Sequence, residues 1–300
     1  MMKRFILRFI LFLVLGYLLG EVVVRYYKLT SDVPHRYVDT HGLQLYEPGQ
    51  TGYFKGASEP WTVNEFGWLG INTIENKNRR ISIIGDSYIE NIMNPDNCNQ
   101  GYLLQELNPE VGFFEAGRSG VTFIEALEIA QKMDSLDFDE HLIYVTDADF
   151  TESFANKTRY ADRLQVDLDR NIILKGELKS PGLKKILYNL KFMYYLYLRF
   201  PLFVGEQNKG EIAATEDFDR NSFDRLFAFC QSNYDLRKIT LIFHPETSDD
   251  IVSFFKEKGL RHIRLVVQNG KSWDLNAADG HWSCLGHAQA ARQITAAIIK

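Results

Sequence analysis

The chain has 300 residues, which is enough for one large domain or two small ones with a sizeable hydrophobic core. Its formal net charge of -5 gives no sign of the basic surface of nucleic-acid-binding proteins, so nucleic acid is not expected as a partner. Cys98, Cys230 and Cys284 lie far apart without a CxxC pair. This spacing argues against a structural zinc site and a disulfide framework; at least one thiol is free, and Cys284 is interpreted as a packing residue.

The N-terminal segment has the composition of a membrane helix. Residues 5–24 are apolar except for Arg8 and Glu21, and about twenty residues suffice to cross a hydrocarbon core. Basic residues before this stretch slightly favour a cytoplasmic N-terminus. No A-x-A-like cleavage site follows, so within residues 1–28 an anchor is favoured over a removed signal peptide. We therefore expect a single-pass protein of the cytoplasmic membrane with the remaining chain on its outer, periplasmic or extracellular side.

The rest of the chain predicts an α/β domain preceded by a lead-in. Residues 29–79 are rich in Gly, Pro, Tyr and Trp and are expected to form turns and short strands that pack on the domain. From residue 80 to 300, short apolar runs alternate with helical patterns, which predicts a parallel sheet. Strands are expected within 80–87 and at 111–116, 141–145, 239–243 and 263–267, and helices around 124–133, around 251–258 and from 287 onward.

An insertion at about 151–222 contributes no obvious strand to this sheet. Within it, residues 183–200 carry an apolar stripe with helical spacing, and such a stripe is expected to pack on the core. The alternative is a lid or a membrane-surface helix beside the anchor, which the aromatic and basic residues permit. Residues 205–216 are polar and are expected to form a mobile loop.

A serine directly follows the first predicted strand. In Ile84-Gly85-Asp86-Ser87 the hydroxyl would lie at the carboxyl edge of the sheet, where open α/β folds bind ligands. A helix starting here would place the backbone N–H of Ser87 where an oxyanion forms. Taken alone, the tripeptide is more often a strand followed by a helix cap.

Two further segments carry candidate site residues. In Asp279-Gly280-His281-Trp282 an extended backbone points residues 279 and 281 to the same side, so the Asp279 carboxylate could bind Nδ1–H of His281 and leave Nε2 for a serine. A lone D-x-H is more often a surface histidine. After the second strand, Gly117 allows a backbone N–H to approach a substrate oxygen.

In this order and spacing the three segments resemble the SGNH/GDSL hydrolase family over about residues 80–300. The resemblance implies a flavodoxin-like three-layer α/β/α fold, with Ser87 as nucleophile and Asp279 and His281 completing a catalytic triad. It also implies an oxyanion hole formed by Ser87 and Gly117. The segment 279–287 is the most specific, and 64–70 is similar to the lead-in of membrane-anchored members encoded with surface-polysaccharide genes.

One position departs from the family pattern. After the third strand the family usually has G-x-N-D, whose Asn donates to the oxyanion, whereas this chain has Ala148 before Asp149. Loss of one oxyanion donor can cost about 2.7–4 kcal/mol of transition-state stabilisation. Related sugar O-acetyltransferases also vary here, so the departure favours transfer or an atypical substrate and leaves room for a catalytically weakened protein.

The resulting prediction is a serine esterase that removes acyl groups, in the first place O-acetyl groups, from a surface or cell-wall glycan through an acyl-Ser87 intermediate. It requires no cofactor and no metal. The alternatives are a glycan O-acetyltransferase using the same residues and a non-catalytic glycan-binding or assembly protein. Expected partners are an acylated glycan or another ester, the membrane and polysaccharide-assembly proteins. His244, at a strand end, is interpreted as structural, and the carboxylates after it lack metal-ligand spacing.

Overall fold

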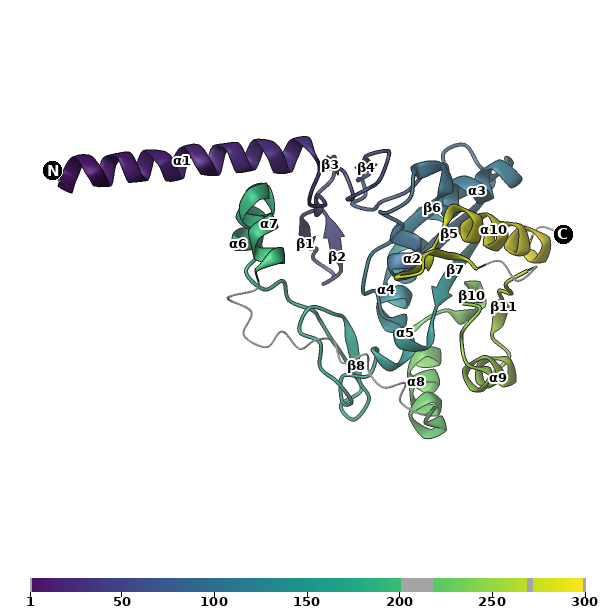
Figure 1. Ribbon diagram of the computed structural model, residues 1–300. Coiled ribbons are helices and arrows are strands. Elements are labelled where there is room, and N and C mark those ends of the chain that lie inside the picture. The colour runs from purple at the N-terminus through teal and green to yellow at the C-terminus, as the bar shows by residue number, and fades with distance from the viewer. Residues whose placement is uncertain (1, 201–217, 269–271, 299–300) are drawn as a thin grey trace.

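A computed structural model describes residues 2–200, 218–268 and 272–298. A five-stranded parallel sheet forms the centre of its α/β domain, and Figure 1 shows this sheet with the surrounding helices. Its strands lie in the order β11 (Arg261–Arg264), β10 (Ile239–Phe243), β7 (Glu140–Val145), β5 (Arg79–Gly85) and β6 (Val111–Gly117). The order reverses between β5 and β7, as in flavodoxin-like folds, and ligands bind such sheets beyond the carboxyl ends of these strands. The predicted α/β fold is confirmed.

Helices cover both faces of this sheet. α3 (Gln100–Leu107) and α10 (Cys284–Ile298) pack on one face, and α4 (Phe123–Met133), α8 (Arg220–Asn233) and α9 (Asp249–Glu257) pack on the other. Every residue of β6, β7 and β10 is buried, as expected for parallel strands covered on both sides.

The last strand differs from the predicted 263–267. β11 ends at Arg264, because its neighbour β10 ends at Phe243 and offers no further partner. Beyond it, the backbone N–H and C=O of Val266 instead bond the side chain of Gln293 on α10, both at 2.9 Å. The predicted strand is therefore confirmed only over residues 263–264, and the backbone of Val266 bonds a helix side chain instead of a neighbouring strand.

The lead-in consists of two small antiparallel pairs, β1 (Arg36–Val38) with β2 (Gln44–Tyr46) and β3 (Thr51–Gly52) with β4 (Trp61–Thr62). Leu43, Leu45 and Trp68 join the apolar cluster of the main sheet.

The N-x-x-G-aromatic-x-G segment of the lead-in is a turn held by Asn64. Its Oδ1 accepts from the backbone N–H of Phe66 (3.0 Å) and Trp68 (3.1 Å). Gly67 and Gly70 have φ of +83° and +100°, which favour glycine. A Cβ on Gly70 would also collide with Glu115 of β6, so this glycine brings the lead-in against the edge strand.

The helix α1 (Met2–Tyr26) is long and apolar enough to cross a membrane, and only Val24 in it is buried. The sequence predicts that residues 183–200 form one helix that packs on the core. Both parts of this prediction are wrong. The segment forms α6 (Pro181–Asn189) and α7 (Lys191–Arg199), separated at Leu190, and α7 packs on α1 (Figure 1). The predicted loop at 205–216 lies outside the described residues.

Specific contacts hold α7 on α1. The carboxylate of Glu21 accepts the backbone N–H groups of Lys191 (3.1 Å) and Phe192 (2.7 Å), and so caps the first turn of α7. The ring of Phe192 lies 5.9 Å from that of Tyr17 and occupies the space that a side chain on Gly20 would need. The acidic interruption of the apolar helix is therefore a docking point for the insertion.

The remainder of the insertion contributes no strand to the main sheet among the residues described. Its β8 (Gln165–Asp167) and β9 (Ile172–Leu174) form a separate antiparallel pair.

Candidate active site

The structure brings Ser87, His281 and Asp279 into one hydrogen-bonded chain. His281 Nε2 lies 2.9 Å from Ser87 Oγ, and His281 Nδ1 lies 2.6 Å from Asp279 Oδ1. The same carboxylate oxygen accepts the backbone N–H of His281 at 3.1 Å, which fixes the i, i+2 geometry. Ser87 follows β5 directly, whereas the other two residues belong to β13 (Asp279–Trp282), which pairs with β12 (Asp274–Asn276).

Ser87 opens α2 (Ser87–Glu90), a helix of a single turn, in agreement with the helix start predicted at this residue. The side chain of Asp86 caps it by accepting the backbone N–H of Tyr88 at 3.0 Å. The turn ends because Asn91 adopts a left-handed φ of 45°. The hydroxyl of Ser87 is thereby presented at the carboxyl edge of the sheet, beside the point where the strand order reverses.

The histidine is supported by an aromatic cluster. The ring of Tyr88 lies 5.4 Å from that of His281 and 4.9 Å from that of His244. Trp282 stacks on His244 and donates its Nε1–H to His244 Nε2 (2.9 Å), and burial lowers the pKa of His244 to about 4. His244 is therefore a neutral acceptor that positions Trp282, in agreement with its structural interpretation.

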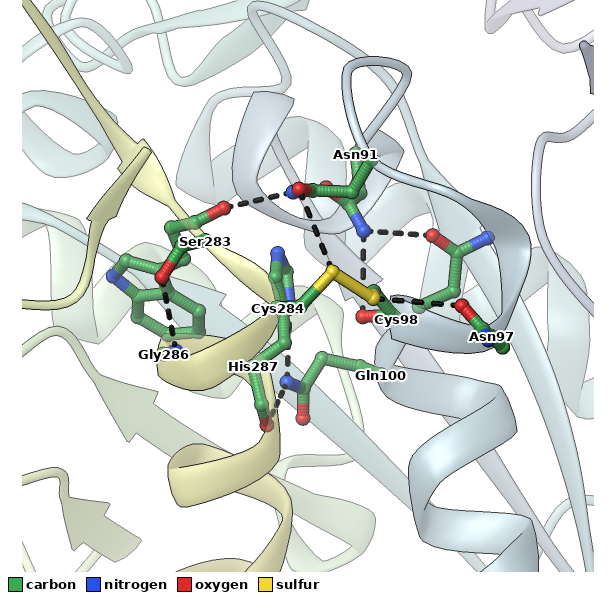
Figure 2. The surroundings of a disulfide bond; sticks show 11 residues. Asn91, Asn97, Cys98, Gln100, Ser283, Cys284, Gly286 and His287 are labelled. Atoms are coloured by element: carbon green, nitrogen blue, oxygen red, sulfur yellow. Dashed lines mark hydrogen bonds between the residues drawn. A yellow bond between two sulfur atoms is a disulfide. The ribbon is translucent and has the colours of Figure 1, made fainter. Parts of the chain in front are cut away.

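A disulfide lies close in sequence to His281. It corrects the interpretation of Cys284 as a packing residue. Cys98 and Cys284 are bonded across a sequence separation of 186, with Cα atoms 5.0 Å apart (Figure 2). Cys284 begins α10, three residues after His281, and Cys98 ends the 3-10 turn that precedes α3. Cys230 is buried and free. The spacing of the cysteines in the sequence does not predict this bond, because the two residues are 186 positions apart and meet only in the folded chain.

Hydrogen bonds reinforce the crosslink on both sides. Asn94 Nδ2 donates to the carbonyl of Trp282 at 2.8 Å, and Gln100 Nε2 donates to the carbonyl of His287 at 2.8 Å (Figure 2 shows the second contact). His287 is buried in the first turn of α10, where burial lowers its pKa to about 3. It is a neutral structural residue, and the histidine that contacts Ser87 is His281.

Gly117 lies at the end of β6, paired with Gly85. A Cβ here would stand 2.4 Å from the backbone nitrogen of Glu90, so only glycine lets α2 pack this closely on the sheet. The backbone N–H groups that follow are occupied, since Arg118 donates to Gly85 O (3.2 Å) and Ser119 donates to Glu90 (3.1 Å).

Glu90 is a site-supporting residue that the sequence analysis missed. It is buried at the end of α2 and accepts hydrogen bonds from the hydroxyls of Tyr46 and Ser119. These bonds tie the turn that carries Ser87 to the lead-in and to the loop after β6. The three residues come from distant segments, so no single motif marks them.

Position 148 lies exposed in the first turn of α5 (Asp147–Thr151), directly after β7. Asp149 closes a capping box by accepting the backbone N–H (2.7 Å) and hydroxyl (3.0 Å) of Thr146. Burial, together with the nearby Asp86 carboxyl, raises the pKa of Asp149, and burial likewise raises that of Asp86. By contrast, the hydrogen bond from His281 lowers the pKa of Asp279, so this carboxylate is the ionised partner of the histidine.

A second Ser–His–Asp chain begins in the core at Ser82 and ends at the partly exposed Asp134. Ser82 Oγ is 2.7 Å from His141 Nδ1, and His141 Nε2 is 3.3 Å from Asp134. Ser82 and His141 are fully buried within strands, and burial lowers the pKa of His141. No substrate can reach this serine, so we interpret the chain as hydrogen bonding of buried polar groups.

The sequence matches no family model and no curated protein. Solved structures similar to the chain include a lipolytic protein of the G-D-S-L family from Desulfitobacterium hafniense (10% identity, TM-score 0.40), covering 74% of this chain and 100% of that one. A psychrotrophic esterase from Pseudoalteromonas sp. has 11% identity and a TM-score of 0.40, covering 74% and 97%. A catalytic mutant of an acetylxylan esterase from Geobacillus stearothermophilus has 12% identity and a TM-score of 0.37, covering 74% and 95%.

The family resemblance rests on the motif residues, on their order along the chain and on the hydrogen-bonded chain that they form beyond the carboxyl ends of β5 and β7. In these features the chain is similar to the SGNH/GDSL hydrolases.

Proposed function

We propose that the protein is a serine esterase of the SGNH/GDSL type that acts on acylated glycans. The observation that carries this proposal is the unbroken chain from Ser87 Oγ through His281 to Asp279, at 2.9 Å and 2.6 Å. Nucleophile, base and orienting carboxylate within such distances are the arrangement that activates a serine hydroxyl.

In the proposed reaction, Ser87 Oγ attacks the ester carbonyl while His281 Nε2 takes the hydroxyl proton. Asp279 holds Nδ1–H and stabilises the imidazolium that results. The tetrahedral oxyanion would be bound by the backbone N–H groups of Ser87 and Gly117. Its collapse breaks the bond to the sugar oxygen, which takes the proton from His281, and leaves acyl-Ser87. Water, activated by His281, then releases the acid and restores the serine.

A fluorophosphonate probe tests the nucleophile directly. We expect Ser87 to be labelled in the wild type and labelling to disappear in Ser87→Ala and His281→Ala. Ser135→Ala removes an exposed serine hydroxyl elsewhere and serves as the matched control. Labelling that persists in Ser87→Ala would refute the assignment, and an unreactive Ser87 together with glycan binding would favour the non-catalytic binding protein.

Transfer to a sugar hydroxyl is the second candidate, and Ala148 in place of the usual Asn is the observation that favours it. With the oxyanion held mainly by backbone groups, hydrolysis of small esters should be slow. A bound acceptor supplies binding energy and positioning that a small ester lacks. Acetyl release and acetyl-glycan formation, followed together with and without oligosaccharides, distinguish the two reactions.

We propose that α1 anchors the protein and that residues 29–300 lie outside the cytoplasmic membrane, with 29–79 as a lead-in to an SGNH domain spanning 80–300. The length and composition of α1 support the anchor. The bond between Cys98 and Cys284 supports the outer location, since disulfides persist in oxidising compartments.

A further inference from the structure

A cavity of about 640 Å³ opens between the lead-in and the insertion. One wall comes from residues 33–47 and the other from residues 159–188. Five cationic side chains line it against two carboxylates, although the whole chain carries a net charge of -5. The local sign of charge is thus opposite to that of the molecule and favours an anionic ligand.

Part of this positive charge is uncompensated. Lys185 pairs with Glu47 at 2.9 Å, and Arg159 is occupied by backbone carbonyls and by the side chain of Gln165. Lys179 and Lys184 are exposed on the cavity wall, and neither has an ion-pair partner among the residues described. These two ammonium groups are available to a ligand.

A buried amide adds a second, independent indication. Gln44 is 2% exposed and lines the cavity; its Nε2 donates to the carbonyl of Asp162, but its Oε1 has no hydrogen-bond partner. An unsatisfied buried acceptor is unfavourable, and a ligand hydroxyl would satisfy it. Tyr160 and Tyr188 also line the cavity, and their rings pack on Arg163 and Tyr194, respectively.

The cavity wall is connected to the nucleophile. Arg36, which lines the cavity, donates to the hydroxyl of Tyr46 at 3.3 Å, and Tyr46 in turn donates to Glu90. Glu90 is the last residue of the turn that Ser87 begins. Hydrogen bonds therefore link the cavity wall to the turn that presents the serine.

We propose that this cavity binds a negatively charged stretch of the glycan substrate, with Lys179 and Lys184 contacting its acidic groups and Gln44 Oε1 accepting a sugar hydroxyl. The inference rests on the proposed function and specifies its substrate as an acidic polysaccharide.

Binding of two defined probes tests this without requiring turnover. Full-length protein in non-ionic detergent is titrated calorimetrically with tetragalacturonate and with its methyl ester, which has the same sugars but no charge. We expect several-fold tighter binding of the acid, with a difference that shrinks as salt is added. Lys179→Gln with Lys184→Gln should weaken binding of the acid about three- to tenfold and leave that of the ester unchanged.

The matched control is Lys256→Gln with Arg292→Gln, which makes the same change of net charge on α9 and α10, outside the cavity wall. Equal binding of acid and ester, or equal loss in the control, would overturn the proposal. So would tighter binding of glycerophosphoglycerol than of tetragalacturonate, because a lipid headgroup would then be the ligand.

Fluorophosphonate labelling of the same preparation distinguishes a wrong substrate class from a wrong catalytic function. Labelled Ser87 without preference for the acid overturns the substrate class alone. Unlabelled Ser87 with lysine-dependent binding of the acid overturns the catalytic function and supports the acidic-glycan site.

Discussion

Removal of the Cys98–Cys284 crosslink should destabilise the domain strongly. The bond closes a loop with a sequence separation of 186. In the chain-entropy treatment, closing a loop of this length reduces the conformational entropy of the unfolded chain. This raises the free energy of the unfolded state by about 5 kcal/mol at room temperature. Losses on removing native disulfides are roughly 2–5 kcal/mol, so we expect a decrease in the free energy of unfolding within this range for Cys98→Ser with Cys284→Ser.

Urea unfolding of full-length protein in non-ionic detergent, with and without reductant, measures this effect. Either single substitution should cost about as much as the pair, because each breaks the same bond. Cys230→Ala retains the crosslink, so its stability should remain sensitive to reductant, whereas that of the double variant should not. An unchanged free energy of unfolding for reduced wild type, or an equal response of the double variant to reductant, would refute the reasoning.

The crosslink should matter less for the chemistry than for stability. Hydrogen bonds from Asn94 to Trp282 and from Gln100 to His287 hold the same loop. We therefore expect the reduced, still folded protein to keep most of its reactivity toward the fluorophosphonate probe. Loss of labelling before any loss of fold would show instead that the disulfide itself positions His281.

Ser87→Ala and His281→Ala should each abolish turnover of an aryl acetate, and the double variant should be little worse than either, because the pair acts as a unit; independent multiplying losses would contradict this. Ala148→Asn should raise the rate of small-ester hydrolysis if its amide reaches the oxyanion, and fast hydrolysis by the wild type without acceptor would show that no donor is missing. Burial raises the pKa of Glu115 from 4.5 to about 8, so the folded chain keeps a proton that the unfolded chain releases, and this group makes stability fall as the pH rises between these values. Glu115→Gln should reduce the difference between the free energies of unfolding measured with urea at about pH 5 and about pH 8. An unchanged difference would contradict the raised pKa of Glu115. Reporter fusions after about residue 40 should be active only if they function outside the cytoplasm, and activity of a cytoplasmic reporter alone would reverse the proposed orientation.

Much of the fold could be predicted because its signals are local. The apolar runs ending at Gly85, Val145 and Phe243 are short, β-rich and bounded by turns, so each identifies a buried strand without knowledge of its neighbours. The i, i+2 spacing of Asp279 and His281 likewise determines that one carboxylate can bond the imidazole. The apolar length of the first helix is also a property of the sequence alone.

Tertiary structure decided the partners of these elements, which local patterns do not specify. The stripe at 183–200 shows which face of a helix is apolar but not what covers it, and α7 packs on α1 because Glu21 caps its first turn. Cys98 and Cys284 meet only because the sheet places the start of α10 beside the segment after α2. Glu90 supports Ser87 through Tyr46 and Ser119, three residues brought together from separate segments. Local periodicity depends on a few neighbouring residues, whereas these contacts depend on how the whole chain is packed.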